Sequence, residues 1–189
     1  MASDFQKKKF LHFFRAFDSG NYITEGVFLT QLDRLGQIRG IDPDSENAKH
    51  TRADRLQWWQ GLSAMIDTNG DGKLSQDEFV GFWLHIADTA KAEMGTDTTP
   101  THDMLVGTAV SAFDLLDAND DGHITEKEYT DWFRSWSDYI ASTDSHAAFK
   151  SLSDGGKTLN KEQLTEYVVE FFAGDNPDAP GTNLYGIIE

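Results

Sequence analysis

The sequence contains no cysteine, which excludes disulfide bonds, thiolate metal sites and cysteine nucleophiles. No apolar run approaches the length needed to cross a membrane. Residue 2 is Ala where N-myristoylation requires Gly, and the opening stretch MASDFQKKKFLHFF lacks the apolar segment of a signal peptide. These absences predict a soluble cytoplasmic protein without a transmembrane segment.

Basic residues are also scarce, with 16 Lys and Arg against 32 Asp and Glu and a net charge of −16. Such an excess argues against binding to nucleic acid or to an anionic membrane surface. The excess acidic side chains repel one another unless bound cations neutralise part of their charge. Disorder can also accompany an acidic composition, but 13 Phe, 5 Trp and 5 Tyr provide ample material for a core.

Proline occurs four times, always in segments with Gly, Asp or Thr that read as connections: Pro43, Pro100, Pro177 and Pro180. Between these segments, apolar residues recur at the helical spacing i, i+3, i+4, i+7. We expect eight helices, with the apolar stripes forming a core rather than a cofactor pocket. The four stripes are Phe10, Phe13, Phe14 and Phe17; Phe79, Phe82, Trp83 and Ile86; Tyr129, Trp132, Phe133 and Trp136; and Leu164, Tyr167, Val168 and Phe171.

Two segments match the twelve-residue EF-hand loop, namely DTNGDGKLSQDE and DANDDGHITEKE. Calcium prefers about six to eight oxygen ligands, which this loop supplies from side chains at positions 1, 3, 5 and 12, a backbone carbonyl at position 7, and a hydroxyl or bridging water at position 9. The predicted ligands are Asp67, Asn69, Asp71, Lys73, Ser75 and Glu78 in one loop, and Asp117, Asn119, Asp121, His123, Thr125 and Glu128 in the other.

The rest of each loop agrees with this interpretation. Gly72 and Gly122 at position 6 permit a sharp turn, and Leu74 and Ile124 at position 8 are predicted to form a short β-bridge with a partner loop. The sequences SQDE and TEKE are capping boxes that start the exiting helices. The alternative, two acidic surface turns, would bring three carboxylates together in each loop. Each like-charge pair at ~4 Å and an effective dielectric of ~20 would cost on the order of 4 kcal/mol.

EF-hands pair, so two further hands are expected, and both are degenerate. The first stripe is followed by DSGNYITEGVF, in which taking Ile23 as position 8 places Val27 at position 12. Starting the loop at Asp18 instead leaves it about two residues short. Either way the bidentate carboxylate is missing, and we expect no calcium there.

The stretch SLSDGGKTLNKEQL has two interpretations. Taking Leu159 as position 8 of an EF-hand places Leu152, Asp154, Gly156, Lys157 and Gln163 at positions 1, 3, 5, 6 and 12, so almost every ligand is lost. The tripeptide GKT could instead end a phosphate-binding loop, but Ser151 stands where that loop needs its first glycine. Such a loop also needs a preceding strand, whereas HAAFKSL is typical of a helix. The sequence favours a degenerate hand in which GGKT forms a turn.

With these motifs, the whole chain resembles the invertebrate sarcoplasmic calcium-binding protein family, including its calexcitin branch. The opening DFQKKKFLHFFRAFD, the order of four hands, LSDGGKT and the tail NLYGIIE carry the resemblance. It implies a compact globule of face-to-face paired hands whose C-terminal tail enters the apolar centre. It also implies soluble calcium buffering or calcium-dependent signalling. Many members of this family keep a working first hand, from which DSGNYITEGV departs.

Two related groups imply alternatives. Insect juvenile hormone diol kinases are similar to the calexcitin branch and imply a nucleotide-using enzyme, although no catalytic base or complete phosphate loop is identifiable here. Photoproteins and luciferin-binding proteins imply a small ligand. In photoproteins a His and a Trp near the end of the last helix face a tail Tyr; Tyr185 fits, but Val168 and Phe172 stand where His and Trp are expected. This argues against light emission.

The sequence therefore predicts an all-α protein of four EF-hands in two paired lobes forming one compact globule, with only short β-bridges between loops. Residues 1–90 form the first pair (hand 1 degenerate, hand 2 intact), residues 101–172 the second (hand 3 intact, hand 4 degenerate), and residues 173–189 a tail docked on the core. We expect a monomer without catalytic residues that binds two Ca²⁺ ions, with Mg²⁺ competing. A calcium buffer or signalling protein is favoured, with a calexcitin-like calcium sensor or a diol-kinase-like nucleotide-using enzyme as the alternatives. A calmodulin-like sensor is disfavoured because such sensors use Met-rich grooves.

Overall fold

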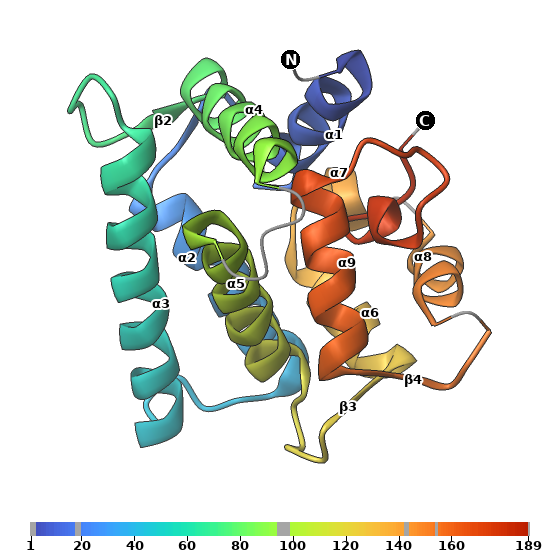
Figure 1. The fold of residues 1–189 in the computed structure, drawn as a ribbon. Coiled ribbons are helices and arrows are strands. Elements are labelled where there is room, and N and C mark those ends of the chain that lie inside the picture. Colours follow the sequence, from blue (N-terminus) through green and yellow to red (C-terminus); the bar gives the residue numbers. More distant parts are fainter. Residues whose placement is uncertain (1–2, 18–19, 94–98, 142–143, 154, 189) are drawn as a thin grey trace.

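The computed structural model describes residues 3–17, 20–93, 99–141, 144–153 and 155–188 (Figure 1). Within these ranges the first half of the chain comprises α1 (Asp4–Arg15), β1 (Tyr22–Ile23), α2 (Glu25–Arg39), α3 (Glu46–Ile66), β2 (Leu74–Ser75) and α4 (Gln76–Ala92). The second half comprises α5 (Pro100–Leu116), β3 (His123–Thr125), α6 (Glu126–Ser135), α7 (Asp138–Ala141), α8 (Ser145–Leu152), β4 (Thr158–Asn160), α9 (Lys161–Ala173) and the 3₁₀-helix η1 (Pro180–Asn183).

The predicted fold class is confirmed. The described residues hold nine α-helices, one more than the eight expected, and two small sheets of two strands each. None of these helices is both long and apolar enough to cross a lipid bilayer.

The helix boundaries follow from local chemistry. Each longer α-helix is preceded by a residue whose side-chain oxygen accepts a hydrogen bond from a backbone N–H in the first turn, which satisfies a donor that the helix leaves free. These N-cap residues are Ser3, Thr24, Ser45, Ser75, Thr99, Thr125, Asp144 and Asn160. The predicted capping boxes at the starts of α4 and α6 are present, and α1 and α9 have them too.

The loops pair through short antiparallel strands. Ile23 lies opposite Leu74 in the β1–β2 pair, and Ile124 lies opposite Leu159 in the β3–β4 pair. All four residues are buried at 0 to 1% exposure, so each pair joins two loops through apolar contact as well as backbone hydrogen bonds. The predicted β-bridges of Leu74 and Ile124 are confirmed, and their partners are the two residues assigned to position 8 of the degenerate hands.

The aromatic stripes form the core, as predicted. Of the sixteen stripe residues, Phe17, Phe82 and Tyr167 are partly buried and the others are buried. Rings from both halves of the chain meet, since Phe13 contacts Phe79 at 5.5 Å and Trp136 at 6.0 Å between ring centroids. Such aromatic pairs contribute about 0.5–1.5 kcal/mol each beyond their buried area.

Polar contacts also join the two halves. The Gln31 side chain on α2 donates to the Ser135 hydroxyl on α6 at 2.6 Å. The Ser137 hydroxyl donates to the Arg15 carbonyl at the end of α1 at 2.9 Å. The structure is therefore one compact body, and the lobe boundaries of 1–90 and 101–172 stay a prediction.

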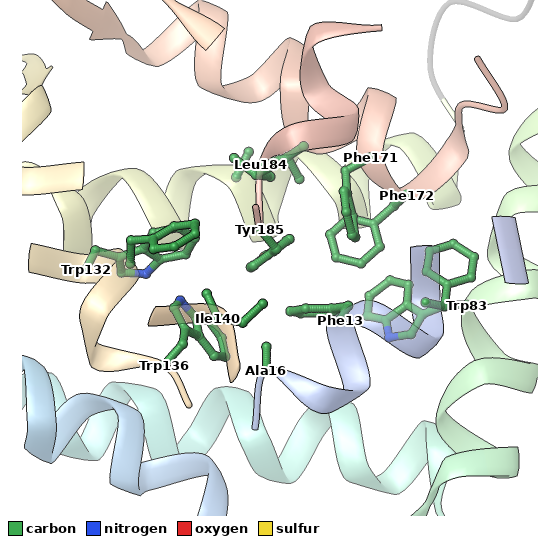
Figure 2. Packing of buried hydrophobic residues seen from close by; sticks show 14 of the residues in the cluster. Phe13, Ala16, Trp83, Trp132, Trp136, Ile140, Phe171, Phe172, Leu184 and Tyr185 are labelled. Carbon is green, nitrogen blue, oxygen red and sulfur yellow. The ribbon is translucent and has the colours of Figure 1, made fainter. Parts of the chain in front are cut away.

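The C-terminal segment crosses the aromatic centre. Leu184 and Tyr185 are buried, and Figure 2 shows Tyr185 between Trp132 and Trp136 on one side and Phe13 on the other. The Tyr129 hydroxyl donates to the Leu184 carbonyl at 3.0 Å, and His12 Nε2 lies 2.8 Å from the Tyr185 carbonyl. Burial lowers the pKa of His12, which favours the neutral ring.

A buried lysine fixes the turn into this segment. Lys9 Nζ on α1 donates to the Gly174 carbonyl at 2.8 Å, just beyond the end of α9. A cation is favoured at a helix C-terminus because the helix dipole is negative there. Burial lowers the pKa of Lys9 to about 8, and the charges of Asp175 and Glu170 offset part of this shift.

Candidate calcium sites

The hand 2 loop follows α3 directly. The Asp67 carboxylate accepts hydrogen bonds from the backbone N–H groups of Gly70 at 2.8 Å and Gly72 at 2.9 Å. Asn69 Oδ1 accepts from the N–H of Asp71 at 2.9 Å. The chain is thus wrapped around its own side-chain oxygens, and Asp67 Oδ1 accepts from both Gly70 and Asp71.

The turn in this loop depends on glycine. Gly72 has φ of +77°, and its counterpart Gly122 in hand 3 has φ of +81°. A β-carbon in this region costs about 1–2 kcal/mol. The glycine predicted at position 6 is therefore needed by the backbone itself.

Glu78 lies at the third residue of α4 and closes the hand 2 loop. One carboxylate oxygen accepts from the Thr68 N–H at 3.1 Å, and the other from the Ser75 N–H at 3.0 Å and hydroxyl at 2.7 Å. The hydrogen bonds from Ser75, and then those from Thr68, lower the pKa of Glu78 to about 2, so this carboxylate is ionised at neutral pH. The exiting helix thus presents an oriented anion to the start of the loop.

The hand 3 loop repeats this arrangement. The Asp117 carboxylate accepts from the Gly122 N–H at 2.8 Å, and Asp121 accepts from the His123 N–H at 2.9 Å. Glu128 accepts from the Ala118 N–H at 3.0 Å and from the Thr125 N–H at 2.8 Å. Both loops therefore place the same oxygen types at the same positions.

The predicted residues at positions 7 and 9 also lie in this frame. Lys73 and His123 have exposed side chains, and their backbone carbonyl oxygens are the atoms predicted to ligate the cation. The hydroxyls of Ser75 and Thr125 each donate to the glutamate of their own loop at 2.7 Å. Their remaining lone pairs are available to a cation or to a bridging water.

The expected clustering of carboxylates within each loop is not observed. In the part of the chain that the structure describes, no three His, Asp or Glu side chains are grouped as metal ligands would be. The carboxylates instead bind separate N–H groups of their own loops, which relieves the repulsion expected between Asp67, Asp71 and Glu78. The oxygen-only donor set nevertheless fits a hard cation such as Ca²⁺, to which these side chains would have to turn.

The degenerate hands keep the frame and lose the ligands. At the helix position occupied by Glu78 and Glu128, hand 1 has Val27 and hand 4 has Gln163. Gln163 Oε1 still accepts from the Asn160 N–H at 3.0 Å, so it preserves the cap without a charge. Asp18 and Asp154, considered above as loop residues, lie outside the described residues.

The GGKT stretch leads into a strand rather than a nucleotide loop. Helix α8 precedes it, and Thr158 begins β4, which pairs with the hand 3 loop. A β-carbon on Gly156 would lie 2.8 Å from the Ser153 carbonyl oxygen, so a tight turn accounts for this glycine. These features agree with the degenerate-hand interpretation.

Sequence reasoning missed a residue that supports hand 3. The Arg39 guanidinium, at the end of α2, donates to the carbonyls of Leu115 at 2.8 Å and Leu116 at 3.0 Å. These carbonyls end α5, immediately before the loop begins at Asp117. Burial lowers the pKa of Arg39, while Asp131 and Glu128 oppose that shift. Only the fold brings α2 to this helix end, so no local motif could have signalled this contact.

Two family models match segments of this chain. A family model described as an EF-hand domain pair matches residues 65–86, and one described as an EF hand matches residues 109–133. The matched segments contain the two loops whose geometry is given above. The chain therefore carries two EF-hand motifs. No curated protein matches it.

Solved structures share this fold, and one of them is a sarcoplasmic calcium-binding protein. Such a protein from amphioxus is 19% identical, with 98% of each chain covered and a TM-score of 0.67. A coelenterazine-binding protein from Renilla muelleri, in its calcium-loaded apo form, is 14% identical, covers 96% of this chain and 94% of its own, and has a TM-score of 0.70. A calcium-binding protein from Streptomyces coelicolor is 16% identical, covers 90% and 99%, and has a TM-score of 0.66. At these identities the likeness shows the fold.

Proposed function

We propose that this EF-hand protein is a cytoplasmic, monomeric calcium buffer with two active sites, one in hand 2 and one in hand 3. The ligands would be the twelve residues predicted from the sequence, with Asp67 and Glu78 closing one site and Asp117 and Glu128 the other. Both loops hold these oxygens in the same hydrogen-bonded frame. When bound, calcium would supply positive charge that neutralises the loop carboxylates.

Hands 1 and 4 would act as structural partners. Each contributes one strand to a pair with an intact loop and lacks the acidic residue that would complete a site. This arrangement gives each lobe one working site, with residues 1–90 and 101–172 as the two lobes and residues 173–189 as the docked tail.

The burial of the tail is the observation that carries the buffer proposal. The Tyr185 ring lies 4.1 Å from that of Phe13 and 4.8 Å from that of Phe171, between centroids, and it also contacts Trp132 and Trp136. A calcium sensor opens an apolar groove for its targets. Here the protein's own C-terminal segment fills the space between the helices, which favours calcium uptake without target binding.

The proposal is tested by calorimetric titration of chelator-stripped protein with calcium, alongside Glu78→Gln and Glu128→Gln. We expect two sites, each abolished by one substitution. Glutamine is a suitable replacement because Gln163 keeps the same cap in hand 4. Repeating the titration in magnesium measures competition. A third site, or binding that survives both substitutions, would contradict the assignment.

Buffer and sensor are then separated by a dye that reports exposed apolar surface. A buffer should show little change in dye fluorescence on calcium addition, because Leu184 and Tyr185 stay in the core. A sharp calcium-dependent increase would instead indicate an opening groove and overturn the buffer proposal.

A further inference from the structure

A cavity of about 50 Å³ lies at the aromatic centre. Its buried wall includes Phe13, Trp83, Trp132 and Tyr185 (Figure 2). Its half-buried wall comes from α3 and α5, the two helices at the left and centre of Figure 1. The cavity therefore has an apolar interior and an open side between α3 and α5.

Three residues on the wall of this cavity carry unpartnered donors. Arg55 Nε, Trp83 Nε1 and Trp136 Nε1 are buried and have no hydrogen-bond acceptor among the residues that the structure describes. A buried donor left unpaired costs about 1–3 kcal/mol. These three donor atoms have almost no accessible surface, so they lie within the cavity wall, and the Arg55 guanidinium is the charged group on that wall.

Arg55 also supplies an uncompensated positive charge. Its guanidinium lies 4.8 Å from the Phe28 ring centroid and 5.2 Å from that of Trp58, stacked at the half-buried wall. Burial lowers its pKa to about 10, so it remains charged at neutral pH. No carboxylate among the described residues pairs with it, although Asp and Glu outnumber Lys and Arg by 32 to 16 in the chain.

Two other arginines have polar partners for their guanidinium groups. Arg52, one turn earlier on α3, pairs with Asp33. Arg39 satisfies its charge on the two helix-end carbonyls described above. Arg55 faces aromatic rings instead, in a protein whose net charge of −16 would repel most anions. Attraction of an anion here requires this local cation.

We propose that the cavity binds a small organic acid, whose carboxylate pairs with Arg55 while its apolar body extends along α3 and α5 through the open side. This site goes beyond calcium binding and does not depend on it. A guanidinium stacked on aromatic rings is suited to hold a planar carboxylate through two parallel hydrogen bonds.

The volume limits the ligand. A cavity of about 150 Å³ holds a benzene molecule, whereas one water needs about 10–15 Å³ of such space. The cavity at Arg55 therefore accommodates the carboxylate and the atoms next to it, and the remainder of the acid would extend through the open side along α3 and α5. A few ordered waters are the competing occupant.

The test is calorimetric titration of the full chain with 4-phenylbutyrate and with its neutral amide, in calcium and in chelator. We expect the acid to bind and the amide to bind at least tenfold more weakly. Arg55→Met removes the charge and keeps an apolar side chain, and should weaken acid binding at least tenfold. Arg52→Met makes the same change in net charge on the same helix outside the cavity, and should leave binding unaltered.

Indole N–H resonances supply a second readout. Those of Trp83 and Trp136 should shift on acid binding, whereas a ligand on the outer surface would leave them in place. Equal binding of acid and amide, unchanged binding by Arg55→Met, or no binding of either compound would overturn the proposal and leave water as the occupant. The calcium sites are scored separately in the same samples, so this result and the buffer proposal fail independently.

Discussion

Hands 2 and 3 have the same ligand pattern but differ in what supports them. The hand 2 loop is joined to its partner by strands of two residues, and its Glu78 is half-buried. The hand 3 loop is joined by strands of three residues, and its Asp117 and Glu128 are only 9% and 8% exposed. The entering helix of hand 3 is also anchored from the other half of the chain by Arg39.

Ligand identity alone would predict equal sites, whereas the supporting contacts predict unequal ones. Preorganisation reduces the ordering cost that binding must overcome. We therefore expect hand 3 to bind calcium more tightly than hand 2, and the following experiments test that ranking in order of effect.

The largest effect should come from removing each position-12 carboxylate. Bound calcium should stabilise the fold by roughly 3–4 kcal/mol per site at a hundred- to thousandfold excess over the dissociation constant. Glu78→Gln and Glu128→Gln should each remove one such increment, measured by denaturant unfolding with and without calcium. At limiting calcium Glu128→Gln should cost more. A larger loss of stability in Glu78→Gln would contradict the predicted ranking of the two hands.

A smaller effect should come from Arg39→Lys, which keeps the charge but cannot reproduce the paired hydrogen bonds. Loss of these charge-assisted bonds should lower the free energy of unfolding by about 1.5–3 kcal/mol. Calcium calorimetry should show weaker binding at hand 3 and unchanged binding at hand 2. Arg52→Lys on the surface of α3 is the matched control, and equal weakening of both hands would show that Arg39 does not act on hand 3 specifically.

Glycine substitution should affect the two loops alike. Gly72→Ala and Gly122→Ala each force a β-carbon into positive φ, at a cost of about 1–2 kcal/mol. Chelator-stripped protein should lose this much stability in both variants, as measured by urea unfolding. A clearly larger loss at Gly122 would mean that the anchoring of hand 3 restricts its backbone relaxation.

The smallest effect concerns a hydrogen bond found at hand 3. His146 on α8 pairs with Glu126 in the first turn of α6, and this bond raises the pKa of His146 above its usual 6.5. The pair should therefore stabilise the fold fully below pH 6.5 and lose that contribution as the pH rises through the higher folded value. An NMR titration of His146 should show the raised pKa, and Glu126→Gln should return it toward 6.5. If His146 titrates unchanged in that variant, Glu126 is not the cause of its raised pKa.

Much of the fold was readable from local patterns. The aromatic stripes, the capping boxes at SQDE and TEKE, and the position-8 residues of all four hands lie where expected, because helix periodicity and loop spacing are encoded over a few residues. The same spacing located both loops of the EF-hand pattern, since position 6 requires glycine and position 12 coincides with the third residue of the exiting helix.

The arrangement of charges was less readable. The loop spacing predicts that the carboxylates lie close to one another. In the structure they instead accept hydrogen bonds from separate backbone N–H groups, such as those of Gly72 and Thr68. Backbone donors are present at every residue and leave no sequence signal. Their use depends on how the loop is wound.

The sequence by itself determined which loops carry the oxygens that calcium needs, which hands are degenerate, and which side chains form the core. Only the tertiary structure decided that Arg39 supports hand 3, that Lys9 holds the end of α9, and that Arg55 faces an aromatic cavity. The reason is one of range. Ligand spacing and helical periodicity act within about a dozen residues, whereas these contacts join helices that become neighbours only when the whole chain packs.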